Sequence, residues 1–313
     1  MNSQIIDRSP IIMSRVENYF KKSISASAIN TYLRCPLDFY YKYIAELGEE
    51  QNVEEDIESQ QFGSLVHHAL EILYQPFALF DSYGNKVNPK PKALCEEDVL
   101  TMLKRYKKIL YNEFYKYFDK DDQLFLKGKN LVSYTIAQDT IENTLKKELL
   151  FLKNLEEELF IVQLEAKQSM TLSLNVNGRM REISFTGYID RIDKVGEEYR
   201  VIDYKSGNVK PEDVKFVEKE NTLLTFSKCK HAVQLAMYAL FLKEKQGHYP
   251  SEATIFSLTD VQQLSYPLSS ASHDIEEVCN LFKHFLTQLL GEIFDSEKAF
   301  EHNEDSKYCN YCE

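Results

Sequence analysis

The sequence predicts an α/β fold in which a mixed central sheet is flanked by helices and preceded by a large helical region. Apolar residues repeat with a helical period through the first half of the chain, and with a period of two from about residue 169. An Asn-Gly pair, Asn177-Gly178, then marks a hairpin turn. A helix, a strand and a second helix follow, and this mixture favours a layered α/β unit.

The chain of 313 residues fits one elaborated domain, because no repeat or low-complexity linker divides it. We expect a lead-in segment over 1–22 and a mainly helical region over 23–160. A core over 161–300 and a cysteine-containing tail over 301–313 complete the domain.

The helical region is predicted from caps and spacing. Ser27 is expected to cap a short helix that ends near Cys35, and Pro36 suits the first turn of the next helix. Phe62–Tyr74 places Leu65, Ala69 and Leu73 at helical spacing. Residues 81–93 are rich in Pro, Gly and Asn and indicate a loop, and two longer helices should cover 96–118 and 130–156.

The core begins with a three-stranded meander. Met170, Leu172 and Leu174 alternate with polar residues before the Asn-Gly turn, and the returning strand places Ile183, Phe185 and Ile189 on one face. Its other face carries Ser184, Thr186, Tyr188 and Asp190. A turn at Val195–Glu197 leads to a third strand, Tyr199–Lys205. Beyond it we expect a helix over 230–246 that ends at Gly247, a strand over 253–258 and a long amphipathic helix over 273–294.

The net charge of −12 argues against tight sequence-independent binding to nucleic acid, which depends on Lys and Arg that neutralise phosphates. Two features oppose this argument. Acidic residues that hold a metal form a positive site once the ion is present, and one short stretch is basic. That stretch is either a local groove or an ordinary solvated surface, and the sequence favours neither. Its members are Lys205, Lys210, Lys215, Lys219, Lys228, Lys230 and His231.

The sequence predicts no membrane span, because it has no run of about 18 apolar residues. Its first residues lack the features of a signal peptide, so we expect a cytoplasmic protein. The six cysteines are then expected to stay reduced, since disulfides are rare in that compartment.

Three charged residues near the end of the meander are candidates for chemistry. The period of a strand places Asp203 and Lys205 on one face, and the turn near 196 brings Asp190 towards Asp203. Two close carboxylates repel each other unless a cation lies between them, and oxygen ligands suit Mg²⁺ or Mn²⁺. The alternative is a hairpin with charged residues at its solvent end. A glycosidase-like carboxylate pair is less compatible with the neighbouring Lys205.

Here the sequence resembles a known family. Gly187-Tyr-Ile-Asp-Arg-Ile-Asp193, followed by Asp203-Tyr-Lys-Ser-Gly207, is similar to the core motif of the PD-(D/E)XK nuclease superfamily, and more closely to its RecB/AddB-type domain. The resemblance implies a restriction-endonuclease-like core. It implies that Asp190 and Asp203 bind metal, that Lys205 is catalytic, and that the Tyr204 carbonyl is a further ligand.

Three other segments extend the resemblance. Gly63-x-x-x-His67 looks like the family helix with a metal-binding or catalytic His; a structural His is the alternative, and neighbouring His68 competes for the match. Gln234-x-x-x-Tyr238 resembles the helix that positions the substrate strand, although its residues also suit an ordinary amphipathic helix. Glu165 matches a family acidic position loosely, with a solvated charge as the alternative.

The cysteines resemble the iron–sulfur ligands of the same family. Cys35 lies in a segment similar to the first ligand segment, and Cys309-x-x-Cys312 matches the following pair. A [4Fe–4S] cluster takes four thiolates, and the fourth is missing, so the ligand set here is incomplete. We expect either a piece of a longer protein or a natural loss. A Cys-x-x-Cys pair alone also fits half of a zinc site.

The resemblance implies a metal-dependent DNA nuclease, an exonuclease rather than an endonuclease, in an AddAB/RecBCD-like repair and recombination complex. No Gly-x-x-x-x-Gly-Lys-[Ser/Thr] loop occurs, so a helicase would be a partner subunit or another domain of a longer protein. The alternatives are an inactive nuclease-fold domain that binds nucleic acid or acts as a scaffold, and a structural metal-binding module.

Overall fold

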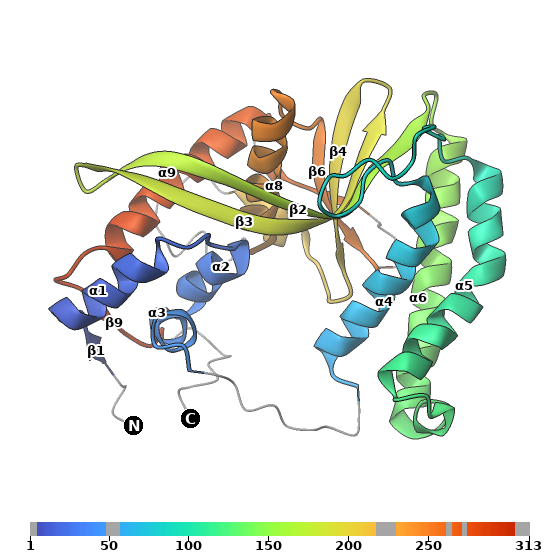
Figure 1. Cartoon of the computed structure of the whole chain (residues 1–313), viewed down its shortest axis with the longest axis horizontal. Helices are drawn as coiled ribbons and strands as arrows, with labels where there is room; N and C mark the ends of the chain where they lie inside the picture. The colour runs from blue at the N-terminus through green and yellow to red at the C-terminus, as the bar shows by residue number, and fades with distance from the viewer. Residues whose placement is uncertain (1–4, 48–56, 217–229, 261–264, 271–273, 304–313) are drawn as a thin grey trace.

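A five-stranded mixed sheet forms the centre of the molecule in the computed structural model, which describes residues 5–47, 57–216, 230–260, 265–270 and 274–303. The strand order is β2-β3-β4-β6-β7. Helices α8 and α9 lie against one part of the sheet, and α4, α5 and α6 form a separate group at its other end (Figure 1). This is the predicted α/β class, consistent with a restriction-endonuclease-like core with a large helical region before it.

The sheet combines an antiparallel meander with one parallel pair. β2, β3 and β4 pair antiparallel in sequence order, β4 and β6 pair parallel, and β7 is antiparallel to β6. The parallel pair needs a crossover, and α8 lies in that connection. The five strands are β2 Leu159–Val176, β3 Arg179–Val195, β4 Glu198–Lys205, β6 Glu252–Ser257 and β7 Ser265–Pro267.

The β2–β3 hairpin turns where the sequence predicts it. Asn177 and Gly178 both have positive φ, 51° and 78°, as a type I′ turn requires. β2 nevertheless begins at Leu159, ten residues before the predicted start at 169. Five of the first six side chains of β2 are buried, so this part of the strand has no polar alternation for the sequence to display.

The helices predicted between residues 27 and 294 lie close to their predicted spans, whereas the helix Pro10–Tyr19 lies in the segment 1–22 that was expected only as a lead-in. One prediction is wrong: the cap of the first short helix is Ser25, whose hydroxyl accepts from the Ala28 amide, whereas Ser27 lies within the helix. Ser25 is the last extended residue before the helix, which is what an N-cap requires. The helices are α1 Pro10–Tyr19, α2 Ala26–Arg34, α3 Pro36–Phe39 continued by a π-helix over Tyr40–Ile44, α4 Ser59–Tyr74, α5 Glu96–Tyr117, α6 Gly128–Lys153, α8 Lys230–Gln246 and α9 Ile275–Ile293.

Shorter elements complete the described chain. Two-residue strands pair as β1 Ile6–Asp7 with β9 Ala299–Phe300, and as β5 Lys215–Phe216 with β8 Ser269–Ser270. Single 3-10 turns cover Gln75–Phe77, Asp122–Leu124 and Pro211–Val214. Among the described helices, none is both long and apolar enough to cross a membrane.

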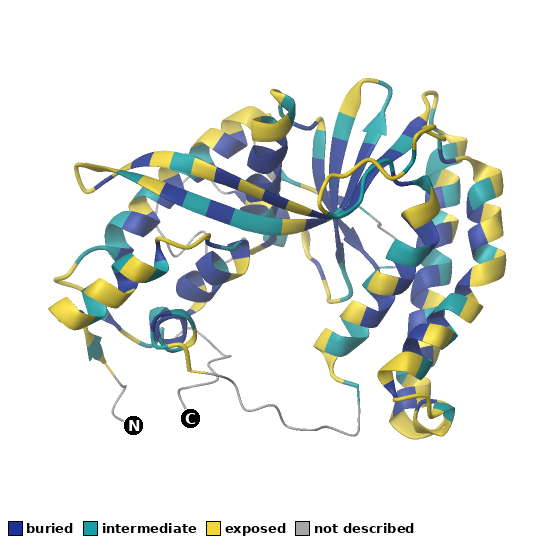
Figure 2. Cartoon of the chain, in the orientation of Figure 1, coloured by how far each residue is buried: buried dark blue, intermediate teal, exposed yellow. Residues whose placement is uncertain are grey.

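The buried hydrophobic residues that the structure describes form two apolar cores, and buried segments are dark blue in Figure 2. The first joins α2, α8 and α9 to one face of the β2–β3 hairpin, with Phe185 and Ile189 fully buried there. The second joins α4, α5 and α6 to the other side of the sheet, around Ile202 and Tyr204. α4 and α8 therefore approach β4 from different cores, and the site lies between these two helices.

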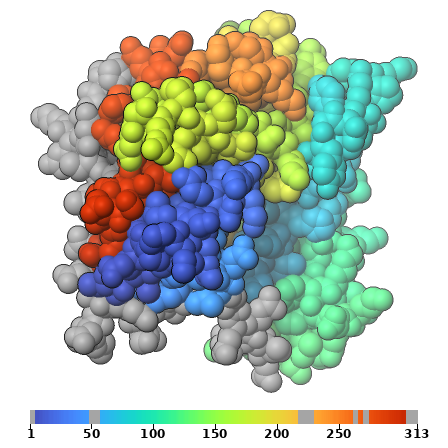
Figure 3. All heavy atoms as spheres, turned by 60° about the vertical axis from the view of Figure 1, so that its left-hand side comes forward, coloured from blue at the N-terminus to red at the C-terminus, as the bar shows by residue number. Residues whose placement is uncertain are grey.

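The N-terminal segment packs on the C-terminal one. The Arg8 guanidinium donates to the carbonyls of Ile293 and Asp295, at the end of α9, and lies 4.2 Å from the centre of the Phe300 ring. In Figure 3 the blue N-terminal helices lie directly against red α9 and the yellow-green hairpin. A cation at the C-terminal end of a helix is favourable, because unsatisfied carbonyls gather there.

Candidate functional site

The candidate site lies where the β2–β3 hairpin separates from β4. The β3–β4 ladder runs from the turn as far as Arg191 and Ile202, and Asp190 is the first residue beyond it. Beyond this point a side chain and not the backbone of β3 bonds to β4. Asp190 Oδ2 accepts a hydrogen bond of 2.6 Å from the Tyr204 amide. The hairpin thus brings Asp190 next to the Asp203–Lys205 segment, as the spacing predicts.

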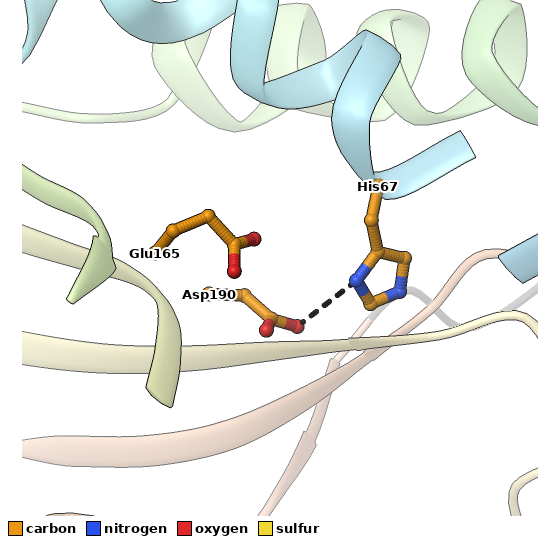
Figure 4. A group of neighbouring side chains, drawn as sticks. All are labelled: His67, Glu165 and Asp190. Atoms are coloured by element: carbon orange, nitrogen blue, oxygen red, sulfur yellow. Dashed lines mark ion pairs between the residues drawn. The ribbon is translucent and has the colours of Figure 1, made fainter. Parts of the chain in front are cut away.

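Three side chains from different elements converge at this point (Figure 4). His67 from α4, Glu165 from β2 and Asp190 from β3 each offer a ligand atom, and these atoms lie within 4.8 Å of one another. The His67 Nδ1 atom is 3.5 Å from Asp190 Oδ2. All three residues are half-buried, so they remain reachable from solvent.

Glu165 reaches this cluster through an unusual backbone conformation. The pairs Leu164–Arg191 and Ala166–Ile189 flank it, which places Glu165 opposite Asp190 in the register. Its φ is +46°, in the left-handed region that residues other than Gly rarely adopt. Such strain persists only where the surrounding structure enforces it, and it is frequent at functional sites.

The electrostatics of the cluster favour a bound cation. Burial, followed by repulsion from Asp203 and Glu165, raises the pKa of Asp190 well above its usual value. Burial, followed by repulsion from Glu71 and Asp203, raises the pKa of Glu165 to about 7. Burial also lowers the pKa of His67, which keeps its imidazole neutral and able to act as a ligand. One nitrogen and two carboxylate donors fit a divalent ion such as Mn²⁺ or Mg²⁺.

Asp203 and Lys205 form an ion pair beside the cluster. Lys205 Nζ is 2.6 Å from Asp203 Oδ2, which agrees with the predicted placement on one strand face. Burial disfavours the ammonium, but attraction to Asp203 and Asp190 outweighs it and raises the pKa of Lys205. A permanent positive charge therefore lies next to the three ligands. Among the described residues, the three-ligand group contains Glu165 and not Asp203.

Gln234 and Tyr238 act on Asp203 from α8. The Gln234 side-chain amide donates to Asp203 Oδ1 at 2.9 Å and to the Tyr238 hydroxyl at 2.6 Å. The two residues are one helical turn apart, so one amide group joins them both to the carboxylate. Tyr238 is only 4% exposed, and Gly187 of β3 lies against its ring. Their observed contacts orient Asp203.

The structure distinguishes His67 from His68. The His68 Nδ1 atom lies 2.6 Å from Glu113 of α5, and His68 is not one of the three converging ligands. His67 instead contacts the Tyr204 main chain, and its ring is 5.8 Å from the Tyr204 ring. Gly63 explains the spacing of the motif, because a Cβ there would lie 2.9 Å from Ser206 Oγ. A glycine lets α4 approach the end of β4.

Arg191 is a residue that the sequence reasoning did not select. Its fully buried guanidinium pairs with Asp193 at 2.7 Å and with Glu148 of α6 at 2.9 Å. It also lies 4.5 Å from the centre of the Tyr74 ring of α4 and 3.4 Å from the Tyr204 hydroxyl. The available signal was an Arg and an Asp that continue the strand face of the buried Phe185 and Ile189.

The remaining predicted residues are not part of this cluster. Cys35 is buried, and its Sγ is 3.6 Å from His302 Nδ1; Cys309 and Cys312 lie outside the described residues. Of the basic stretch, Lys210, Lys215 and Lys230 are exposed and His231 is buried. Lys219 and Lys228 also lie outside the described residues.

The chain is similar to known proteins in sequence and, at a low level, in structure. A solved structure titled "Crystal structure of SSO0001" is similar at 15% identity and a TM-score of 0.22, over 72% of this chain and 85% of that one. None of the curated proteins matches the chain. The family model of the PD-(D/E)XK nuclease superfamily matches residues 23–313. The chain therefore belongs to the PD-(D/E)XK nuclease superfamily.

Proposed function

We propose that the chain is a metal-dependent DNA nuclease that hydrolyses phosphodiester bonds, as an exonuclease rather than an endonuclease. The observation that carries the proposal is the convergence of His67, Glu165 and Asp190 next to the Lys205–Asp203 pair. A structural ion pair or a scaffold does not need two repelling carboxylates, one of them on a strained backbone, beside a neutral imidazole.

Each side chain has a role that follows from its contacts. His67, Glu165 and Asp190 would hold Mg²⁺ or Mn²⁺, which supplies Lewis acidity and neutralises phosphate charge. Lys205 places an ammonium where negative charge develops on the phosphate, and such preorganised charge is a large part of catalysis. Asp203 fixes that ammonium, and Gln234 fixes Asp203 through its amide. Tyr204 holds Asp190 through its backbone amide.

We further propose that the domain acts in an AddAB/RecBCD-like repair and recombination complex. The similarity of residues 187–207 to the RecB/AddB-type motif supports this, and a helicase subunit or domain would be the partner. The net charge of −12 is in keeping with a partner that supplies part of the DNA contacts. An iron–sulfur cluster on Cys35, Cys309 and Cys312 stays a prediction from the same resemblance.

The test is cleavage of end-labelled linear single- and double-stranded DNA with Mg²⁺, Mn²⁺ or EDTA. We expect metal-dependent cleavage by the wild type, reduced on the order of a hundredfold or more in Lys205→Ala and Asp203→Ala. His67→Ala should lose activity and metal affinity, whereas His68→Ala, its matched control, should retain both because His68 faces Glu113. DNA binding without cleavage under every metal condition would contradict the nuclease and favour a binding or scaffolding domain.

A further inference from the structure

One face of the β2–β3 hairpin is left open next to the candidate site. We call the part between Ala166 and Ile189, which extends beyond β4, the ribbon. Buried and exposed residues alternate along it (Figure 2). The apolar face packs on α8 and α9, so the opposite face is turned to solvent.

Two side chains on the open face adjoin the site. Tyr188 precedes Asp190 by two residues, so both side chains lie on the same face of β3. Lys167 stands directly opposite Tyr188 in the register and follows Glu165 by two residues. Tyr188 is 52% exposed and Lys167 is also exposed. An aromatic ring and an ammonium group thus form a cross-strand pair one step from the metal-ligand cluster.

A lone exposed tyrosine is common on protein surfaces, and this chain exposes others, such as Tyr83 and Tyr117. Tyr188 differs from these because it lies two residues from Asp190 and stands opposite Lys167. The rest of the open face carries mainly small hydroxyl side chains, which offer neither a stacking surface nor a charge. They include Ser169, Thr171, Ser173, Ser184 and Thr186.

We propose that Tyr188 and Lys167 form a docking platform for an unpaired DNA strand, in which the Tyr188 ring stacks on the base next to the scissile phosphate and Lys167 pairs with a backbone phosphate. The inference rests on the proposed nuclease function and names its substrate class. Exposed aromatic rings stack on bases of any sequence, and only an unpaired base offers its face to a side chain. Lys167 supplies the complementary charge for a strand that approaches an otherwise acidic cluster.

The platform would favour single-stranded over double-stranded DNA, with no preference for base sequence. A duplex keeps its bases stacked inside, so Tyr188 adds little to duplex binding. A single strand gains both contacts and is held with its phosphate next to Asp190. Tyr188 and Lys167 are accordingly substrate-positioning residues.

The experiment measures binding separately from cleavage. Binding of a fluorescent oligothymidylate, and of a hairpin duplex of equal length, is followed by anisotropy with Mg²⁺ in an Asp203→Asn background that suppresses turnover. Tyr188→Ala should weaken binding of the single strand on the order of tenfold and leave the duplex nearly unchanged. Tyr188→Phe should keep most of the affinity, because it keeps the ring. Lys167→Ala should reduce the slope of log affinity against log salt by about 0.7.

Tyr117→Ala is the matched control, since Tyr117 is 43% exposed on α5, outside the ribbon. The proposal is overturned if Tyr188→Ala binds the single strand as Tyr117→Ala does, or if it loses single strand and duplex equally. Cleavage in the wild-type background keeps the two hypotheses apart. Absence of cleavage with Tyr188-dependent binding contradicts only the nuclease, whereas cleavage that Tyr188→Ala leaves unchanged contradicts only the platform.

Discussion

Glu165 combines a strained backbone with a carboxyl group whose pKa is raised to about 7 by burial and by its acidic neighbours. In the metal-free protein the ionised form is therefore disfavoured by the fold. A cation between Glu165 and Asp190 removes that cost, so binding of the metal and ionisation of Glu165 support each other.

The raised pKa of Glu165 determines whether the stability of the metal-free protein rises or falls with pH. In the unfolded chain a Glu titrates near 4.5, and in the fold Glu165 titrates near 7, so the folded state binds more protons between these values. Stability of the metal-free protein should then fall as pH rises through about 4.5 to 7. Thermal unfolding in EDTA at pH 5 and pH 8 measures it, and Glu165→Gln should show a smaller drop than the wild type. Equal drops in both proteins would mean that Glu165 is not the group responsible.

At the scale of elements, the approach of α4 to β4 decides whether His67 reaches the cluster. Gly63 allows this approach, because a side chain there would meet Ser206, directly after Lys205. Two elements in such contact act as one unit, and a small displacement of a catalytic group has a large effect on rate.

Gly63→Val should destabilise the protein by about 1–3 kcal/mol through overpacking. It should also lower cleavage on the order of tenfold or more, since α4 carries His67 away from Asp190. Ser64→Val puts the same β-branched residue in the same turn of α4 but at an exposed position, and should change stability by less than about 0.5 kcal/mol. Urea denaturation and the cleavage assay measure the two effects. If both variants behave alike, the close packing of Gly63 has no functional importance.

At the scale of the whole molecule, Arg191 connects parts of the chain that are distant in sequence. Its guanidinium contacts α4 through Tyr74, α6 through Glu148 and β4 through Tyr204. A buried charge network of this kind is costly to break, because removal of one partner leaves the others buried and unpaired.

Arg191→Met should destabilise the protein by about 3–5 kcal/mol, since Glu148 and Asp193 lose the buried guanidinium that pairs with both of them. The loss should shrink at pH 4, because burial raises the pKa of Asp193 and a protonated carboxyl needs no cation beside it. Arg181→Met is the control on the same strand; Arg181 pairs with the half-exposed Glu17, and its loss should cost about 1 kcal/mol or less. Urea denaturation at both pH values measures the loss of unfolding free energy in each variant. Equal losses for the two variants would contradict a special role for Arg191.

The sequence predicts most of the fold because local signals agree with it. Period-two alternation and the Asn177-Gly178 pair locate the hairpin, and the turn at Val195–Glu197 fixes which residues of β3 and β4 meet. The first part of β2 could not be located, because it is buried on both faces and lacks alternation. The two-residue strand β9 depends on pairing with β1 near the other end of the chain, which no local pattern encodes, and β7 has only three residues in which a pattern could show.

The residues of the candidate site likewise include some that local sequence predicts and others that only tertiary packing places. Asp190, Asp203 and Lys205 follow from strand period and hairpin length. His67 and Gln234 came only from family resemblance, since the docking of a helix is a tertiary property. The left-handed conformation of Glu165 and the Arg191 network could not be foreseen, because each is imposed by packing around it.

The three ligands of the cluster come from α4, β2 and β3, with α5 and α6 between the first two in the chain. A chain in which α4 has not docked on the sheet therefore does not hold all three together, and no short fragment contains the set. Under the proposed function this has a protective effect for the cell. The chain would become able to cut DNA only after α4 has docked on the sheet, so a copy that is still folding would leave DNA intact.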